Sequence, residues 1–141
     1  MLSGEENFHS YFGAPEGAPK PNPVDADRFD RYGVALEPSE LLWENFDPRF
    51  DAAKTPNEVN RFGWIVELNP WDPNSKPVKH TAMGRLKHEA ATIYVASDGT
   101  VVAYSGDDER FDYMYKFVSA KKIQAGMDPA AMAHNLSLIH I

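Results

Sequence analysis

The sequence has 141 residues, no cysteine, and 14 Lys and Arg against 21 Asp and Glu, giving a formal net charge of −7. The length suits one domain, and a hydrophobic content of 43% suffices for a folded core. The missing cysteines exclude disulfides and thiolate metal sites within these residues. The acidic balance without a basic stripe argues against nucleic-acid binding, whereas many carboxylates suit hard cations such as calcium. No apolar run reaches the roughly 18 residues that a membrane span needs.

Prolines and caps organise the first part of the chain. Residues 14–24 contain four prolines and one glycine, so a long loop is predicted there. Residues 38–46 place a serine at an N-cap position, acids in the first turn and apolar residues at 42, 43 and 46. This pattern predicts a short helix that ends at Asp47-Pro48.

From residue 61 onward the pattern becomes that of short strands separated by turn signals. The predicted strands are residues 62–68, 78–82, 91–96, 100–105 and 113–118. The Asp98-Gly99 pair between the third and fourth is a strong hairpin signal. Five such strands predict an antiparallel meander, the building unit of a β-propeller blade. A β-sandwich stays open, because no internal repeat is visible.

Four polar clusters are candidates for chemistry, and the first two each have a structural alternative. In residues 3–8, strand geometry lets at most one of Glu5 and Glu6 face a given site, and the alternative is a solvated strand end. In the second cluster, the planar guanidinium of Arg61 could clamp a phosphate or carboxylate. Alternatively, Arg61 pairs with Glu58 and holds a loop.

The third cluster contains the best single candidate, Glu89. It follows several basic residues and precedes an apolar strand, flanked by Ala90 and Ala91. A carboxylate in such a place is costly to bury unless it is paired or bound to metal. The neighbouring His88 lacks the His-Glu-x-x-His spacing of zinc proteases, which favours a structural histidine.

The fourth cluster, residues 106–113, holds four carboxylates at a strand end, among them Asp107 and Asp108. This density fits an oxygen-rich cation site, although it lacks the spacing of an EF-hand. An acidic turn exposed to water has the same local sequence. The cluster alone does not distinguish the two.

Taken in order, the four clusters read Ser-Gly-Glu-Glu-Asn-Phe, Asn-Arg-Phe-Gly-Trp-Ile-Val-Glu-Leu-Asn-Pro, Met-Gly-Arg-Leu-Lys-His-Glu-Ala-Ala and Tyr-Ser-Gly-Asp-Asp-Glu-Arg-Phe-Asp-Tyr-Met-Tyr-Lys-Phe-Val-Ser. Over residues 3–119 they resemble the PhoX-type alkaline phosphatases. The resemblance implies a bacterial exported enzyme, periplasmic or extracellular and monomeric, that hydrolyses phosphate monoesters with calcium and iron. It also implies a β-propeller. Together with the strand, loop and helix patterns above, the expected fold is all-β, a partial β-propeller with a long N-terminal loop and a short helix.

The resemblance carries over residue by residue. Glu5 and Glu6 match the family's Glu-Glu pair near the metal cluster. Glu89 matches the carboxylate of its His-Glu motif, so it is the expected metal ligand and catalytic group. Asp107 and Asp108 match the Gly-Asp-Asp strand end, where they either bind calcium or fix a turn.

Three further positions complete the predicted site. Asn7 and Arg61 are candidates for phosphate contact, and Arg61 also for catalysis. Gly4 departs from the family pattern, since members with iron resemble Thr-Cys-Glu-Glu-Asn with the thiolate on iron. Calcium is therefore the expected cofactor, and Gly4 argues against iron. The alternatives are a non-catalytic surface-binding module of the same family and a β-domain whose carboxylates serve solubility alone.

Residues 136–141, Leu-Ser-Leu-Ile-His-Ile, resemble a translated transposon-end adapter from sequencing libraries. Residues 1–135 are then expected to form part of a single β-propeller domain, with 136–141 as an adapter tail. A natural apolar strand is the alternative. We expect the chain by itself to be inactive, and to aggregate or associate through open strand edges.

Overall fold

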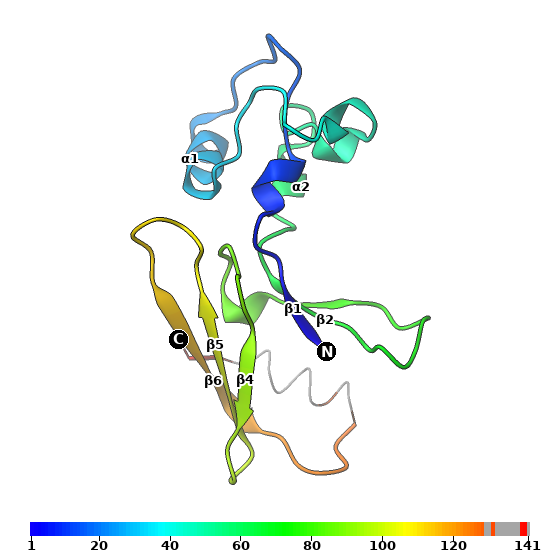
Figure 1. Ribbon diagram of the computed structural model, residues 1–141, viewed down its shortest axis with the longest axis vertical. Coiled ribbons are helices and arrows are strands. Elements are labelled where there is room, and N and C mark those ends of the chain that lie inside the picture. Colours follow the sequence, from blue (N-terminus) through cyan, green and yellow to red (C-terminus); the bar gives the residue numbers. More distant parts are fainter. Residues whose placement is uncertain (129–130, 132–138, 141) are drawn as a thin grey trace. The chain divides into compact units, whose positions relative to one another are not determined.

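The computed structural model describes residues 1–128, 131 and 139–140 (Figure 1). The chain is mostly β, with two small antiparallel sheets and few helices. It divides into two compact units, one made of Met1–Glu6 with Gly63–Ile141 and the other of Asn7–Phe62. We call them the sheet unit and the helical unit. None of the helices in the described residues has the length and apolar character needed to span a bilayer.

The first sheet of the sheet unit has three strands in the order β1-β2-β3. They are β1 (Leu2–Gly4), β2 (Ile65–Glu67) and β3 (Val78–His80). Both pairs are antiparallel, and β1 pairs with β2 across a long stretch of sequence. The predicted strands at 62–68 and 78–82 are confirmed, in shorter form.

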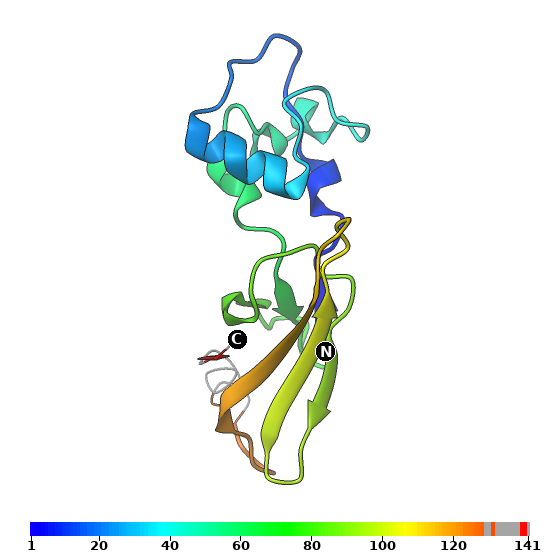
Figure 2. The same ribbon diagram turned by 90° about the vertical axis from the view of Figure 1, so that its left-hand side faces the viewer.

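The second sheet has four antiparallel strands in the order β4-β5-β6-β7. They are β4 (Thr92–Val95), β5 (Thr100–Gly106), β6 (Met114–Lys122) and β7 (Ile139–His140). Figure 2 shows β4, β5 and β6 side by side as a long twisted ribbon. The last three predicted strands are therefore confirmed.

The predicted Asp-Gly turn joins β4 to β5. Ala96 donates its N–H to the carbonyl of Thr100 at 2.8 Å, and Gly99 has a φ of 85°. Only a residue without a Cβ adopts this left-handed conformation at little cost. The turn chemistry read from the sequence thus sets the register of this hairpin.

The prediction of one continuous five-strand meander is wrong. β2 and β3 pair with β1 in one sheet, and β4, β5 and β6 belong to the other. Between β3 and β4 the chain forms the 3₁₀ helix η4 (Thr81–Met83) and then an extended segment. A tight return from β3 onto β4 is therefore impossible.

The predicted C-terminal tail is described only in part. Two of its residues, Ile139 and His140, form β7 on the edge of β6. Residues 136–138 and 141 lie outside the described residues. The adapter interpretation stays a prediction.

The core of the sheet unit lies on one face of the second sheet. Alternate residues of β5 and β6, including Ala103 and Phe117, point to this face and pack with Ile65 and Met83. Burying a large apolar side chain contributes about 1.5–3 kcal/mol. Ala91, at the end of the extended segment before β4, packs against this cluster.

The helical unit is built on aromatic packing. Its helices are α1 (Pro23–Tyr32), α2 (Pro56–Val59) and the 3₁₀ helices η1 (Phe8–Tyr11), η2 (Trp43–Asn45) and η3 (Pro48–Phe50). The buried cluster consists of Phe8, Phe12, Phe29, Val34, Ala52 and Val59. This unit therefore has a hydrophobic core of its own.

The loop predicted over residues 14–24 is wrong at its end, because the first turn of helix α1 begins at Pro23. The Asn22 side chain caps the helix by accepting the N–H of Asp25 at 3.0 Å, and Pro23 occupies the first turn. Gly33 ends the helix in the left-handed conformation with a φ of 70°. Asparagine, proline and glycine are each favoured at these positions.

The helix predicted over residues 38–46 is reduced to η2. Ser39 does not start an α-helix, since its N–H and hydroxyl both donate to the Glu44 carboxylate, at 2.9 and 2.6 Å. Leu42 adopts a left-handed conformation with a φ of 55°. This conformation breaks the helical path, and only one short turn follows.

Candidate functional site

Three extended segments of the sheet unit lie side by side and bring three of the four clusters together. They are residues 4–6, 87–89 and 106–108, which we call the carboxylate edge. His88 donates its N–H to the carbonyl of Glu5 at 3.1 Å, and Asp108 donates its N–H to the carbonyl of Lys87 at 3.0 Å. The sequence order gave no hint of these backbone contacts.

Glu5 is held by the backbone that begins β2. Its Oε2 accepts the N–H groups of Gly63 and Trp64 at 3.0 and 3.1 Å, and its Oε1 pairs with the Lys79 Nζ at 2.7 Å. The side chain is 20% exposed. In this arrangement Glu5 ties the end of β1 to the start of β2 and to β3.

Lys87 connects the second and third segments of the carboxylate edge. Its N–H donates to the Asp107 Oδ1 at 3.2 Å, and its Nζ pairs with the Glu109 Oε2 at 2.6 Å. Lys87 and Asp107 are buried, whereas Asp108 is exposed. Asp107 therefore fixes the turn, and Asp108 presents its carboxylate to solvent.

Glu89 also presents its carboxylate to solvent. Its N–H donates to the carbonyl of Gly106 at 3.3 Å, which sets it beside the end of β5. The residue is exposed, so the burial cost expected from its alanine neighbours does not arise. Within the described residues, no hydrogen bond or ion pair engages its carboxylate. Glu89 is thus available to a ligand.

His88 is a structural histidine, as its sequence context favoured. Its side chain is almost fully buried, with Nε2 3.0 Å from the carbonyl of Gly84 and Nδ1 2.8 Å from the Ser105 hydroxyl. A carbonyl only accepts, so Nε2 carries the proton and Nδ1 accepts from the hydroxyl. Burial lowers the pKa of His88 below its usual range, and the nearby carbonyl and carboxylates only partly offset this. The ring therefore favours its neutral form.

Gly4 stands where the backbone of His88 leaves no room for a side chain. A Cβ at position 4 would lie 2.2 Å from the carbonyl oxygen of His88 and 3.0 Å from its Cβ. Real contacts of a Cβ are longer. A residue larger than glycine therefore requires the first two segments of the carboxylate edge to separate.

The remaining candidates are placed as follows. Glu6 follows Glu5 and is half-buried. Asn7 and Arg61 belong to the helical unit. The Arg61 guanidinium pairs with Glu58 at 2.8 Å, which is the loop-holding alternative given by the sequence. Asn7 is exposed and precedes η1, where its carbonyl accepts the Ser10 hydroxyl at 2.8 Å.

Within the described residues, no three Asp, Glu or His side chains come close enough to form a metal-binding group. At the carboxylate edge, Glu89 and Asp108 are exposed, and their carboxylate oxygens face solvent, where they are available as metal ligands. Sequence reasoning missed Lys87 and Lys79 as partners of the acidic residues. Neither was foreseeable, because each pairs with an acid distant in sequence.

The chain is therefore a mostly β protein in which several carboxylates lie close together where strands end. The family model for "Alkaline phosphatase PhoX" matches residues 1–139. The chain therefore belongs to the PhoX family, as its motifs predicted.

A solved structure gives the same result. The chain is similar to Pseudomonas fluorescens PhoX in complex with vanadate, a transition state analogue, with 46% identity and a TM-score of 0.83. The match covers 98% of this chain and 23% of that chain, so the present chain spans about a quarter of its relative. The comparison with curated proteins gives no match.

Proposed function

We propose that the chain supplies part of a metal-dependent phosphatase that hydrolyses phosphate monoesters. The observation that carries the proposal is the carboxylate edge, which presents Glu89 and Asp108 to solvent in a chain 46% identical to a vanadate-binding PhoX. Vanadate imitates the transferring phosphoryl group. A site of this kind works mainly by positioning and by stabilising charge.

Calcium fits the donors that are present. The exposed carboxylates of Glu89 and Asp108 are the hard oxygen ligands that calcium takes. We include Glu6 as a further proposed ligand. Because the described residues form no three-ligand group, further ligands have to come from elsewhere in a PhoX-type polypeptide. When bound, calcium neutralises the charge on phosphoryl oxygens.

Iron held by a thiolate does not fit this chain. The sequence has no cysteine, and the space beyond the Gly4 Cα is filled by the carbonyl of His88. The proposal assigns hard cations alone to this part of the site.

The chain's own residues have separable roles in the proposal. Glu89 offers a ligand carboxylate, and Lys87 with Asp107 hold its segment against the end of β5. Glu5 fixes the neighbouring segment. Arg61 stays a candidate for phosphate contact and catalysis. In this role its guanidinium leaves the ion pair with Glu58 and binds the phosphate of the substrate instead. Asn7 stays a candidate for substrate contact.

The proposal extends to the whole protein. Residues 1–135 belong to one β-propeller domain of a monomeric bacterial protein that works in the periplasm or outside the cell. Support comes from family membership and from the match to part of P. fluorescens PhoX. The second candidate is a non-catalytic binding module of the same family, which the glycine at position 4 favours.

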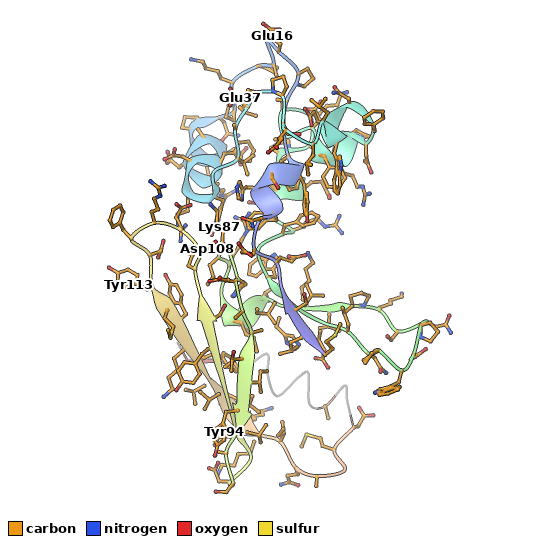
Figure 3. All side chains as sticks on the ribbon, in the orientation of Figure 1. Glu16, Glu37, Lys87, Tyr94, Asp108 and Tyr113 are labelled. Carbon is orange, nitrogen blue, oxygen red and sulfur yellow. The ribbon has the colours of Figure 1, made fainter. Side chains whose placement is uncertain are left out.

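A chimera tests the proposal. The matching 23% of P. fluorescens PhoX is replaced by this chain, and turnover of p-nitrophenyl phosphate is measured with calcium and with a chelator. We expect calcium-dependent turnover. Glu89→Gln should lower kcat/KM by about 100-fold or more, since it removes a charged metal ligand. Glu16→Gln, the same change in an exposed loop of the helical unit (Figure 3), should have no effect.

Two results would contradict the proposal. A folded chimera without turnover, beside an active parent, favours the binding module. Full activity of the Glu89→Gln chimera removes Glu89 from the metal site. Circular dichroism of each chimera establishes that it is folded before activity is compared.

A further inference from the structure

His88 and Glu89 lie in register against the last two residues of β5, Ser105 and Gly106. The His88 Nδ1 accepts the Ser105 hydroxyl at 2.8 Å, and the Glu89 N–H donates to the carbonyl of Gly106 at 3.3 Å. The Glu89 carboxylate also lies beside Gly106, since a Cβ at position 106 would be 3.9 Å from Oε2. Two successive residues of the segment thus contact two successive residues of the strand.

His88 is held from two other directions as well, and its side chain is buried. Its Nε2 donates to the carbonyl of Gly84 at 3.0 Å. Its backbone N–H donates to the carbonyl of Glu5 at 3.1 Å. Together with the Ser105 hydroxyl, these bonds fix the residue that directly precedes Glu89. The backbone that carries the Glu89 side chain therefore has little freedom to move.

The Glu89 carboxylate differs from two others on the carboxylate edge. Glu5 and Asp107 both accept backbone N–H groups, at 3.0 and 3.2 Å. Glu89 is exposed, and within the described residues no hydrogen bond or ion pair engages its oxygens. An open carboxylate on a fixed backbone suits a metal ligand, because little ordering has to accompany binding.

We propose that His88 and Ser105 are positioning residues for Glu89 and hold it where it binds calcium. The inference rests on the proposed function, in which Glu89 is a calcium ligand. Groups that orient a ligand without touching the metal typically raise metal affinity by about 10–100-fold. Ser105 acts on Glu89 through the neighbouring imidazole and not directly. We therefore expect an effect near the lower end, about 10-fold.

Calcium affinity of the P. fluorescens PhoX chimera tests the proposal. It is measured by isothermal titration calorimetry after treatment with a chelator, and Glu89→Gln identifies the binding that depends on Glu89. Ser105→Ala removes the donor to the imidazole and should weaken this binding about 10-fold. Ser105→Thr keeps a hydroxyl and should keep the affinity. Its added methyl group has room, because Ser105 borders a cavity of about 130 Å³.

Ser119→Ala is the matched control. The buried Ser119 hydroxyl accepts the N–H of Val101, also buried, at 2.9 Å near the opposite end of β5. Its loss leaves a buried N–H without this acceptor, so Tm should fall at least as much as in Ser105→Ala. Calcium affinity should stay unchanged. Equal weakening of calcium binding by both alanine variants assigns the effect to general stability and overturns the proposal.

The other outcomes separate this inference from the proposed function. A chimera whose calcium affinity is unchanged by Glu89→Gln overturns both. An affinity lowered by Glu89→Gln but unchanged by Ser105→Ala overturns the inference alone. If Ser105→Ala does not fold, hydrogen exchange in the unmodified chimera decides. Equal protection of the Glu89 amide without and with calcium supports a position formed in advance, whereas protection that arises only with calcium contradicts it.

Discussion

Replacing Glu5 by alanine should destabilise the sheet unit strongly, because two backbone N–H groups lose a charged acceptor. A hydrogen bond to a charged group is worth about 1.5–3 kcal/mol when buried. The Glu5 side chain is 20% exposed, and water replaces part of what is lost. We therefore expect a loss of about 2–3 kcal/mol for the two bonds together.

The ion pair with Lys79 contributes little to this loss. The Lys79 side chain is 35% exposed, so solvent screens the pair. Such pairs are worth about 0.5 kcal/mol. Lys79→Ala is therefore the control, with an expected effect several times smaller than that of Glu5→Ala.

Urea unfolding followed by circular dichroism measures the free energies, and thermal unfolding gives a second reading. A loss of 2–3 kcal/mol corresponds to a fall in Tm of about 8–24 °C for a unit of this size. Equal and small effects of Glu5→Ala and Lys79→Ala would refute the reasoning. In that case the carboxylate does not hold the start of β2.

Further substitutions test other contacts. Gly4→Ala should cost about 1–3 kcal/mol in urea unfolding, since its Cβ meets the His88 carbonyl at 2.2 Å. Gly106→Ala should cost less, because the nearest atom is 3.9 Å away. Burial lowers the pKa of His88, so the unfolded chain takes up a proton below pH ~6.5 while the folded chain resists it. Stability should therefore be full above pH ~6.5 and fall as the pH drops from there toward the lowered pKa, and His88→Gln should flatten this dependence; an unchanged slope would exclude the buried neutral ring. Ser39→Ala should lower Tm by removing the hydroxyl that donates to Glu44 at 2.6 Å, and an unchanged Tm would show that this bond adds nothing.

Local signals predicted the strands well, and the failure to predict helix α1 has a local cause. The Asp98-Gly99 turn specifies the β4–β5 hairpin because both its chemistry and its partners lie within a few residues. Helix α1 was missed although Asn22, Pro23 and Gly33 mark its ends. Residues 14–24 contain four prolines, so the whole range was predicted to be a loop. The last of them, Pro23, instead begins helix α1, a position that proline favours.

The division into two sheets could not be read from the sequence. β1 pairs with β2 through contacts between residues about sixty positions apart, such as Gly4 with Ile65. The same holds for the candidate site. The motifs named Glu89 and Asp108, but only the fold shows that their segments adjoin through Lys87. The exclusion of a side chain at Gly4 likewise depends on a distant carbonyl.

The tie between Glu5 and Trp64 has a consequence for the architecture of the chain. The backbone N–H of Glu5 donates to the carbonyl of Trp64 at 3.1 Å. The two points at which the chain leaves the sheet unit and returns to it are therefore joined by a hydrogen bond. β1 and β2 are in effect a hairpin whose connecting loop is a whole folded unit, Asn7–Phe62. Closure entropy grows only slowly with loop length. Shortening or exchanging the helical unit is therefore expected to change the entropic cost of pairing β1 with β2 only slightly.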